Sequence, residues 1–318
     1  MSCALVTTCF NEIASVRVWQ DNVQAQTRQP EEISIVDAGS TDGTREFLEA
    51  WASRDPRLRL EIWPRCNVAQ GRNRAISNIE AKIIVSTDMG CRLDSRWFEK
   101  LCEPLDKDPA VQVVAGNYAA DESTITTAAA RAALYVNDGY HPRLVPGFLP
   151  SSRSIAYRRS VWEKLNGYPE DMTLAGDDTV YALQIQKAGY KTAYAPDAIC
   201  FWGRHTTLRG YWKEAFVYGR GSGEADLPSP KFFSVEYPGY SRLLSHAHAL
   251  YRATGKSLPA YFTAFKKLDW SAMFLILPLQ YGIAINIYSG YIVGASRGII
   301  HCRACRERLT KDELVSQK

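Results

Sequence analysis

The chain has 318 residues, of which 46% are apolar and 23% are charged. This composition is typical of a globular protein with one large domain or two smaller ones. The net charge of +4 suits an anionic ligand or an anionic membrane surface, and it is too small for a nucleic-acid-binding surface. The eight cysteines are scattered and predict no disulfide framework. We expect no cleaved signal peptide, because the first ten residues lead straight into an apolar run.

The first part of the chain alternates short apolar runs with amphipathic segments. Strands are predicted at 4–8, 33–36, 57–63 and 83–86, and helices at 13–23, 45–52 and 71–79. This alternation is typical of βαβ units, so we expect an α/β fold with a mostly parallel sheet flanked by helices. Neither GxGxxG nor GxxxxGK[ST] occurs, which argues against a dinucleotide site or a P-loop.

Polar side chains follow three of the predicted strands. They are Asn11-Glu12, the run Asp37–Thr44, and Asp88. Ligands bind outside the carboxyl ends of the strands in open α/β sheets, so we expect these groups to gather along one edge. Asp88 could hold a divalent metal and, through it, a phosphate. A single Asp after a strand can equally well cap a helix or a turn.

The second part of the chain contains an adjacent pair of carboxylates. Helices are predicted at 94–105 and 124–136, strands at 111–115 and 191–194, and a loop at 139–152 that could be a lid or a plain connector. Asp177 and Asp178 begin a further helix. Capping and the helix dipole favour Asp there. Two adjacent carboxylates in a cleft also raise each other's pKa, which suits a general base.

Six segments of the sequence resemble family 2 glycosyltransferases, which are inverting enzymes with the GT-A (Rossmann-like) fold. ALVTTCFNE, ISIVDAGSTDGT, GRNRAI and IIVSTDMG resemble the nucleotide-binding half and cover about the first 100 residues. SSRSIAYRRSVWEKLNGYPED and GDDT resemble the acceptor side. The resemblance implies that a nucleotide sugar is bound by Thr8, Asn11, Glu12, Asp37, Arg72, Asp88 and Arg153.

The resemblance also implies the catalytic and metal-binding groups. Asp178 would be the catalytic base, with Asp177 beside it, and Asp88 and His205 would hold Mg²⁺ or Mn²⁺. Arg153 and His205 are also compatible with plain surface roles, and Trp202 could stand where the family has its metal-binding His. The usual DxD motif reads Asp88-Met89-Gly90 here, so the second carboxylate is missing. Mg²⁺ can use one carboxylate plus substrate phosphates, so we expect weaker metal binding before the nucleotide arrives.

The C-terminal part contains a long uncharged stretch. No charged residue occurs between Asp269 and Arg297, which is long enough for a membrane span. Pro278 interrupts it, and basic residues flank both ends, which favours a helical hairpin or an interfacial helix. A buried helix pair is the alternative. Because family members often carry hydrophobic C-terminal segments, the resemblance favours attachment to the cytoplasmic face of a membrane, peripherally or integrally through 270–296.

The expected organisation is a GT-A catalytic domain at 1–225 and a helical, membrane-associated region at 226–318. The catalytic domain would comprise a nucleotide-binding half (1–100) and an acceptor half (101–225). By resemblance, the chain transfers a sugar from a nucleotide-sugar donor, with UDP or GDP, to a hydroxyl acceptor that is lipid-linked or a growing polysaccharide. The alternatives are an inactive nucleotide-sugar-binding protein, a membrane-bound scaffold, and a nucleotidyltransferase.

Overall fold

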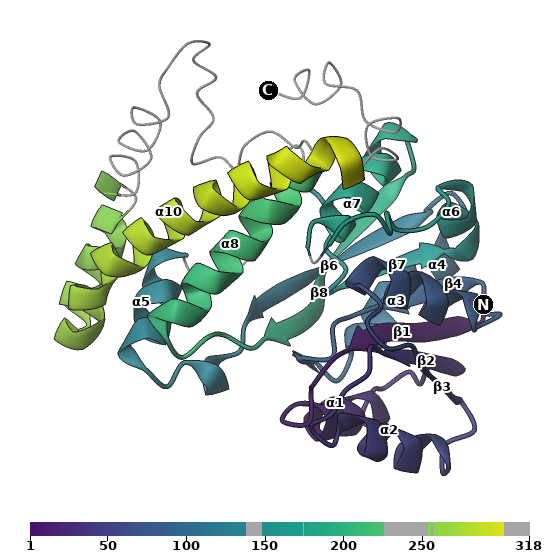
Figure 1. The fold of residues 1–318 in the computed structure, drawn as a ribbon. Helices are drawn as coiled ribbons and strands as arrows, with labels where there is room; N and C mark the ends of the chain where they lie inside the picture. The colour runs from purple at the N-terminus through teal and green to yellow at the C-terminus, as the bar shows by residue number, and fades with distance from the viewer. Residues whose placement is uncertain (138–147, 174, 226–253, 256, 302–318) are drawn as a thin grey trace. The chain divides into compact units, whose positions relative to one another are not determined.

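The computed structural model describes residues 1–137, 148–173, 175–225, 254–255 and 257–301 (Figure 1). Most of the predicted loop at 139–152 lies outside the described residues, as does much of 226–318. The chain divides into two compact units. The first comprises Met1–Ala119, His141–Thr173 and Asp177–Gly203, and the second comprises Ala120–Tyr140, Leu174–Gly176 and Arg204–Lys318.

The first unit is built on an eight-stranded sheet with the order β3-β2-β1-β4-β7-β6-β8-β5. Strands β1 to β4 run parallel, whereas β7 is antiparallel to both β4 and β6, and β5 is antiparallel to β8. The predicted α/β fold with a mostly parallel sheet and flanking helices is confirmed. The strands are β1 (Cys3–Cys9), β2 (Glu32–Asp37), β3 (Leu58–Ile62), β4 (Ile83–Ser86), β5 (Cys91–Leu93), β6 (Val113–Ala120), β7 (Ile155–Arg158) and β8 (Thr192–Trp202).

Alternate side chains of the central strands enter two separate cores, because successive residues of a strand point to opposite faces. Leu5 joins a core with Trp19 and Trp51, whereas Val6 joins one with Tyr157 and Tyr181. Helices therefore cover both faces of the sheet (Figure 1). The first core includes α1 (Val16–Gln24), α2 (Thr44–Ala52) and α4 (Trp97–Lys107), and the second includes α3 (Val68–Ser77), α6 (Arg159–Lys164) and α7 (Asp177–Lys187).

Two strands differ from the sequence-based expectation. β5 was not predicted, because a three-residue strand with a central Arg gives too short a signal. β8 continues to Trp202, well beyond the predicted 191–194, through Pro196 and Asp197. Pro and Asp are depleted in strands, so the pattern alone ends the element early.

The second unit is helical. Its described elements are η1 (Glu122–Thr124), α5 (Ala128–Val136), a helical segment at 257–266, α8 (Leu208–Glu224) and α10 (Trp270–His301). Its core joins small residues of α5 to Tyr211 of α8 and Ile276 and Leu279 of α10. Helix α10 continues through Pro278 without a break, so the hairpin alternative is wrong within this helix. Among the described residues, one helix, Trp270–Arg297, is long and apolar enough to cross a membrane by length and composition alone.

Candidate functional site

Helix α3 is seated tightly against the end of β1. The Thr8 hydroxyl donates a hydrogen bond to the Val36 carbonyl at 3.0 Å, and a Cβ on Gly71 would collide with that hydroxyl. Only glycine therefore allows α3 to approach β1 this closely. The close approach places the next residue, Arg72, inside the unit, where it is 5% exposed.

Arg72 joins two carboxylates that are far apart in the sequence. Its guanidinium donates to Asp177 at 2.5 Å, at the start of α7, and to Asp88 at 2.7 Å, just beyond β4. Hydrogen bonds between a guanidinium and carboxylates are short and strong, and they fix geometry as well as charge. The structure thus brings Arg72, Asp88 and Asp177 together in one cluster.

Asn73 and Asn67 hold α3 to the segment before α7. The Asn73 side chain donates to the Tyr168 carbonyl at 2.9 Å and accepts from the Tyr168 amide at 2.8 Å. The Asn67 side chain donates to the Glu170 and Met172 carbonyls at 2.7 and 2.9 Å. These bonds fix the position of α3 relative to the segment that leads into α7. They therefore help to keep Arg72 within reach of Asp177.

Asp88 lies between two arginines. Besides Arg72, its second oxygen faces Arg153 at 3.7 Å, and the Arg153 guanidinium stacks over the Trp202 ring at 4.0 Å. Burial acts to raise the pKa of Asp88, but the two arginines outweigh it, so the pKa lies below its ordinary value. Asp88 is therefore an anion beside two cations, and its side chain is 37% exposed.

Asp177 and Asp178 are adjacent but have different surroundings. Asp177 is buried against Arg72, and burial raises its pKa above the ordinary value despite that guanidinium, with the Asp178 charge adding to the rise. Asp178 is half-buried, and within the described part of the chain it accepts hydrogen bonds from the hydroxyls of Ser151 at 3.3 Å and Thr179 at 3.4 Å. Asp177 is therefore bound to Arg72 inside the unit, whereas the Asp178 carboxylate is more accessible to solvent.

The loop after β2 folds back over Asp37. This side chain is fully buried and accepts from the Ser40 hydroxyl at 2.5 Å and the Ser40 amide at 3.1 Å. Asn11, with a φ of 56°, accepts from the Thr41 amide at 2.9 Å and so links the loops after β1 and β2. Asp37 and Asn11 lie at the expected edge of the sheet, because Cys9 pairs with Asp37 across β1 and β2.

The position of the missing carboxylate is faced by Glu12. A Cβ placed on Gly90 would lie 3.8 Å from both carboxylate oxygens of Glu12, with nothing nearer. Burial, and then the charges of Asp88 and Asp42, raise the pKa of Glu12 against the Ser15 hydrogen bond. Among the described residues, no three His, Cys, Asp or Glu form a ready-made metal site. Carboxylate oxygens such as those of Asp88 and Glu12 are the kind of ligand that Mg²⁺ and Mn²⁺ prefer.

His205 belongs to the second unit. Its ring meets Tyr211 edge-on at 5.3 Å, and its Nε2 lies 3.8 Å from Glu214. Burial and the nearby cations Arg204 and Lys213 lower its pKa, against the charge of Glu214. A lowered pKa keeps the imidazole neutral, which a metal ligand requires. Its role as a metal ligand stays a prediction.

Aromatic rings also pack against the two arginines, and the sequence did not predict these contacts. Trp202 at the end of β8 stacks on Arg153, and Tyr118 of β6 lies 5.8 Å from the same guanidinium. The Tyr168 ring lies 5.6 Å from the Arg72 guanidinium. Arginine between aromatic rings loses mobility but keeps its charge. An aromatic residue in a sequence gives no sign of such a partner, because the contact depends on strand order.

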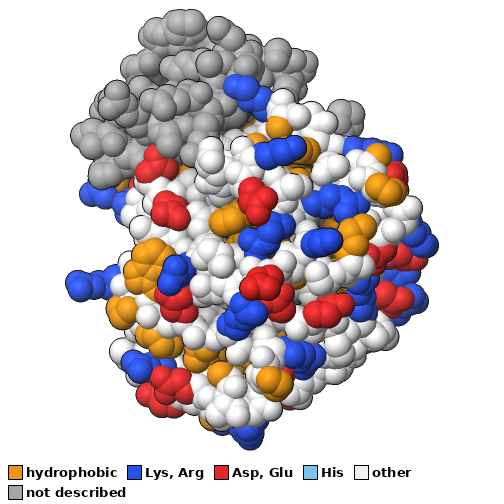
Figure 2. Space-filling view, turned by 90° about the vertical axis from the view of Figure 1, so that its right-hand side faces the viewer, with side chains coloured by type: hydrophobic (Ala, Val, Ile, Leu, Met, Phe, Trp, Pro, Cys, Tyr) orange, Lys and Arg blue, Asp and Glu red, His pale blue; other side chains and the backbone are white. Residues whose placement is uncertain are grey.

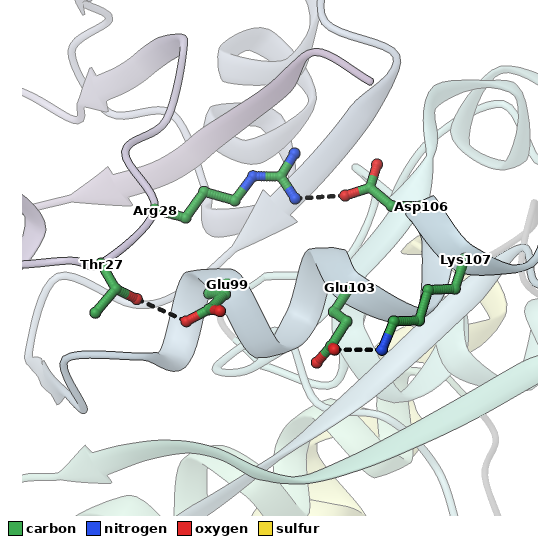
Figure 3. A pocket seen from close by; sticks show the side chains of 6 residues that line it. All are labelled: Thr27, Arg28, Glu99, Glu103, Asp106 and Lys107. Carbon is green, nitrogen blue, oxygen red and sulfur yellow. Dashed lines mark hydrogen bonds and ion pairs between the residues drawn. The ribbon is translucent and has the colours of Figure 1, made fainter.

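A separate polar pocket is lined by residues from α4 and the chain before β2 (Figure 3). Arg28 pairs with Asp106, Lys107 pairs with Glu103, and Glu99 accepts a hydrogen bond from Thr27, so each charged side chain that lines this pocket already has a partner. On the face drawn in Figure 2, basic and acidic side chains are interspersed over the described residues. That mixture agrees with the small net charge.

With the geometry established, comparison with known proteins defines the class. The structure is similar to the mannosyltransferase PcManGT from Pyrobaculum calidifontis, solved in complex with GDP-Man and Mn²⁺. The TM-score is 0.57 at 20% identity, over 94% of this chain and 87% of that one, which shows a shared GT-A-like fold. The family model of glycosyl transferase family 2 matches residues 4–165, just over half of the chain. The chain belongs to glycosyl transferase family 2.

Two curated relatives show the range of similarity. The chain is 30% identical over 213 residues to the O-antigen chain rhamnosyltransferase WbaN of Salmonella anatum, covering 63% of this chain and 65% of that protein. It is 21% identical over 239 residues to the poly-beta-1,6-N-acetyl-D-glucosamine synthase of Staphylococcus aureus strain COL, covering 71% and 55% respectively. The chain therefore spans less than two thirds of the length of either relative.

Proposed function

We propose that the chain is an inverting glycosyltransferase that moves a sugar from a nucleotide-sugar donor to a hydroxyl acceptor. The observation that carries this proposal is the Arg72 bridge from Asp88 to Asp177, with Asp178 next in the chain. It joins the nucleotide-side carboxylate to the start of α7 in one charged cluster. The family and the fold support the reaction class.

Asp178 is the general base of the proposed reaction. Its carboxylate takes the proton of the acceptor hydroxyl as that oxygen attacks the anomeric carbon. The bond from the anomeric carbon to the diphosphate oxygen breaks on the opposite face, and the nucleoside diphosphate leaves. Asp178 suits this role because its hydrogen bonds come from the Ser151 and Thr179 hydroxyls and from no cation. Asp177 holds Arg72 and so positions the start of α7.

The leaving diphosphate is neutralised by the charges around Asp88. Arg72 and Arg153 supply guanidinium groups that match phosphate oxygens. We propose that Asp88 and Glu12 hold Mg²⁺ or Mn²⁺, which supplies Lewis-acid charge neutralisation when bound. Glu12 takes the place of the carboxylate that Gly90 lacks. His205, which the resemblance also implied as a ligand, belongs to the second unit, and its role stays a prediction.

The donor and acceptor classes are proposals from the relatives. PcManGT was solved with GDP-Man, which supports a nucleoside diphosphate sugar as the donor. Asp37, with Thr8, Asn11 and Arg72 along the same edge, forms the proposed nucleotide-binding side. The names of the two curated relatives support a polysaccharide acceptor. A lipid-linked acceptor and a location at the cytoplasmic face of a membrane are further parts of the proposal, and they rest on the resemblance and on the apolar C-terminal helix.

A donor screen tests the proposal. The full chain would be incubated with UDP- and GDP-sugars, each with Mn²⁺, Mg²⁺ or a chelator, and release of nucleoside diphosphate would be measured with and without polyprenyl-phosphate-linked acceptors. We expect release from one donor class, faster with Mn²⁺. Nucleotide binding without release from any donor would support the inactive binding protein, and release of pyrophosphate from a nucleoside triphosphate would support a nucleotidyltransferase.

A further inference from the structure

One helical segment of the second unit exposes large apolar side chains and buries small ones. In the segment at 257–266, the buried positions include Ala260 and Ala264, whereas Leu258, Phe262 and Phe265 are 66%, 60% and 56% exposed. Helices in water bury large apolar residues and expose polar ones. Small residues inside and aromatic residues outside indicate that the outer face meets an apolar phase.

This exposed face continues into the start of α10. Six of the twelve large hydrophobic side chains that are exposed among the described residues fall within 258–274, so they are concentrated and not scattered. Phe265 and Trp270 are in edge-on contact at 5.9 Å. Concentrated exposed apolar surface marks an interaction site. The apolar patch consists of Leu258, Phe262, Phe265, Leu268, Trp270 and Phe274.

The turn in the middle of the apolar patch is held in place. Leu268 has a φ of 53° and is 69% exposed. The next residue, Asp269, accepts from Arg131 at 2.6 Å and Tyr135 at 3.0 Å, both on α5, and from the Ala272 amide at 3.1 Å. The patch therefore belongs to the folded unit and is not a frayed end.

Two lysines beside the apolar patch indicate what it binds. Lys266 and Lys267 lie within the patch sequence, and the Lys266 ammonium sits 4.3 Å above the Phe262 ring. Lysine stems lie along apolar surface while the ammonium reaches the charged layer above it. Apolar side chains bordered by lysines match the boundary between acyl chains and headgroups of an anionic leaflet.

Helix α10 is fixed along a polar helix. A Cβ on Gly219 or Gly223 of α8 would collide with the backbone of α10, and one on Gly290 or Gly294 of α10 would collide with the backbone of α8. The two helices lie side by side in Figure 1. This row of backbone contacts joins Phe216–Glu224 to Ile287–Ala295.

The polar helix α8 makes a membrane span by α10 costly. Alongside the contact row, α8 carries Lys213, Glu214, Arg220 and Glu224. If α10 crossed a bilayer in this arrangement, these side chains would enter the hydrocarbon layer with it. Charged side chains are strongly disfavoured there, so α10 must either leave α8 or stay outside the hydrocarbon core.

We propose that the apolar patch docks the chain onto an anionic lipid leaflet and that α10 lies along α8 without crossing the bilayer. This inference rests on the membrane location within the proposed function and specifies its mode. Docking places the patch at the depth of the headgroups, with Lys266 and Lys267 against lipid phosphates.

Vesicle flotation of the full chain tests the inference. We expect the chain to float with vesicles of phosphatidylcholine plus phosphatidylglycerol, to bind weakly to phosphatidylcholine alone, and to be released by high salt or alkaline carbonate. Phe265→Glu and Phe274→Glu should each weaken binding about tenfold or more. Lys266→Glu/Lys267→Glu should weaken it for anionic vesicles. The matched control is Phe10→Glu, an equally exposed phenylalanine of the first unit, which should float normally.

Three outcomes would overturn the inference. Resistance to carbonate with equal binding to both vesicle types would mean that α10 spans the bilayer. Absence of flotation, with a dimer in light scattering that Phe265→Glu converts to a monomer, would assign the patch to a second copy of the chain. Flotation unaffected by the patch variants would place the lipid contact elsewhere. None of these outcomes changes donor turnover with a soluble acceptor, so a failure of the proposed reaction is detected separately.

Discussion

In the first unit, Arg72 holds Asp88 and Asp177 through charged hydrogen bonds, whereas in the second unit α8 and α10 meet backbone against backbone at glycines. The first contact depends on charge and tolerates small changes of shape. The second depends on shape, and charge has no part in it. Removing a charge should therefore disrupt the first contact, whereas adding a methyl group should disrupt the second, and the following variants test this difference.

Asp178→Asn should have the largest effect, because it removes the base and leaves the shape of the cluster unchanged. A positioned base contributes about 10²–10⁴-fold to rate, so kcat should fall by that factor. Donor affinity, measured by calorimetry, should stay the same because Asp88 and Arg72 are intact. Normal turnover would remove Asp178 from the mechanism.

Arg72→Met should destabilise the first unit, because it leaves the buried Asp177 without its cation. Breaking a buried ion pair costs about 3–5 kcal/mol. The control is Arg74→Met on the same helix, whose ion pair with Glu61 is more exposed and should contribute less than about 1 kcal/mol. The free energy of unfolding in urea measures both. Equal losses for the two variants would contradict the bridge.

Gly219→Ala should destabilise the second unit, although alanine is the better helix former. The added Cβ collides with the Ile287 carbonyl, and overpacking costs about 1–3 kcal/mol. Gly255→Ala is the control, because a Cβ there meets nothing within 4 Å. Thermal unfolding should show a lower midpoint for the first variant only. An unchanged midpoint for Gly219→Ala would mean that the helices are not packed this closely.

Asp269→Asn tests a charge within the second unit. Hydrogen bonding to Arg131 lowers the pKa of Asp269 well below its ordinary value. A carboxyl group with a lowered folded pKa adds stability above its unfolded pKa and loses it as the pH falls toward the folded pKa. At pH 7 the free energy of unfolding of the wild type should exceed that of the variant by about 1–2 kcal/mol. This difference should shrink below a pH of about 4, where the carboxyl group becomes protonated in the unfolded chain. A constant gap in urea titrations across pH would contradict the ion pair.

The metal ligands give the smallest expected change. Glu12→Gln should weaken Mn²⁺ binding in the presence of nucleoside diphosphate by about tenfold, and Gly90→Asp should strengthen it by a similar factor, since each changes one carboxylate ligand. Electron paramagnetic resonance of free Mn²⁺ measures both. Glu46→Gln, which removes an equal but exposed charge on α2, is the control. If Glu12→Gln and the control behave alike, Glu12 is not a ligand.

Strand-end residues were the most predictable part of the site. Asp37 and Asp88 follow apolar runs, and parallel strands bring their carboxyl ends to one edge, so their common location follows from local pattern. The burial of Asp37 beneath its own loop did not follow, because it depends on Ser40 turning back. The contact between Arg153 and Trp202 could not be predicted from the sequence pattern either. Arg153 precedes β7 and Trp202 ends β8, and β6 lies between these two strands in the sheet.

The C-terminal stretch shows a different limit. Composition left a span, a hairpin, an interfacial helix and a buried pair all open. The helix that packs against α10 narrows the choice among these four arrangements. That helix is α8, and its contact glycines lie about 70 residues before their partners in α10. Hydropathy reports how apolar a helix is, and it carries no information about which neighbour the helix packs against.

A single guanidinium, that of Arg72, pairs with both Asp88 and Asp177. In the proposed reaction, binding of the nucleotide sugar would therefore change the net charge around the start of α7. A phosphate that attracts Arg72 leaves two anions short of their counter-charge. In the proposed reaction, we therefore expect the divalent ion to bind more tightly after the nucleotide than before it. Because two carboxylates share one cation, the proposed site sets the order in which the nucleotide and the metal bind.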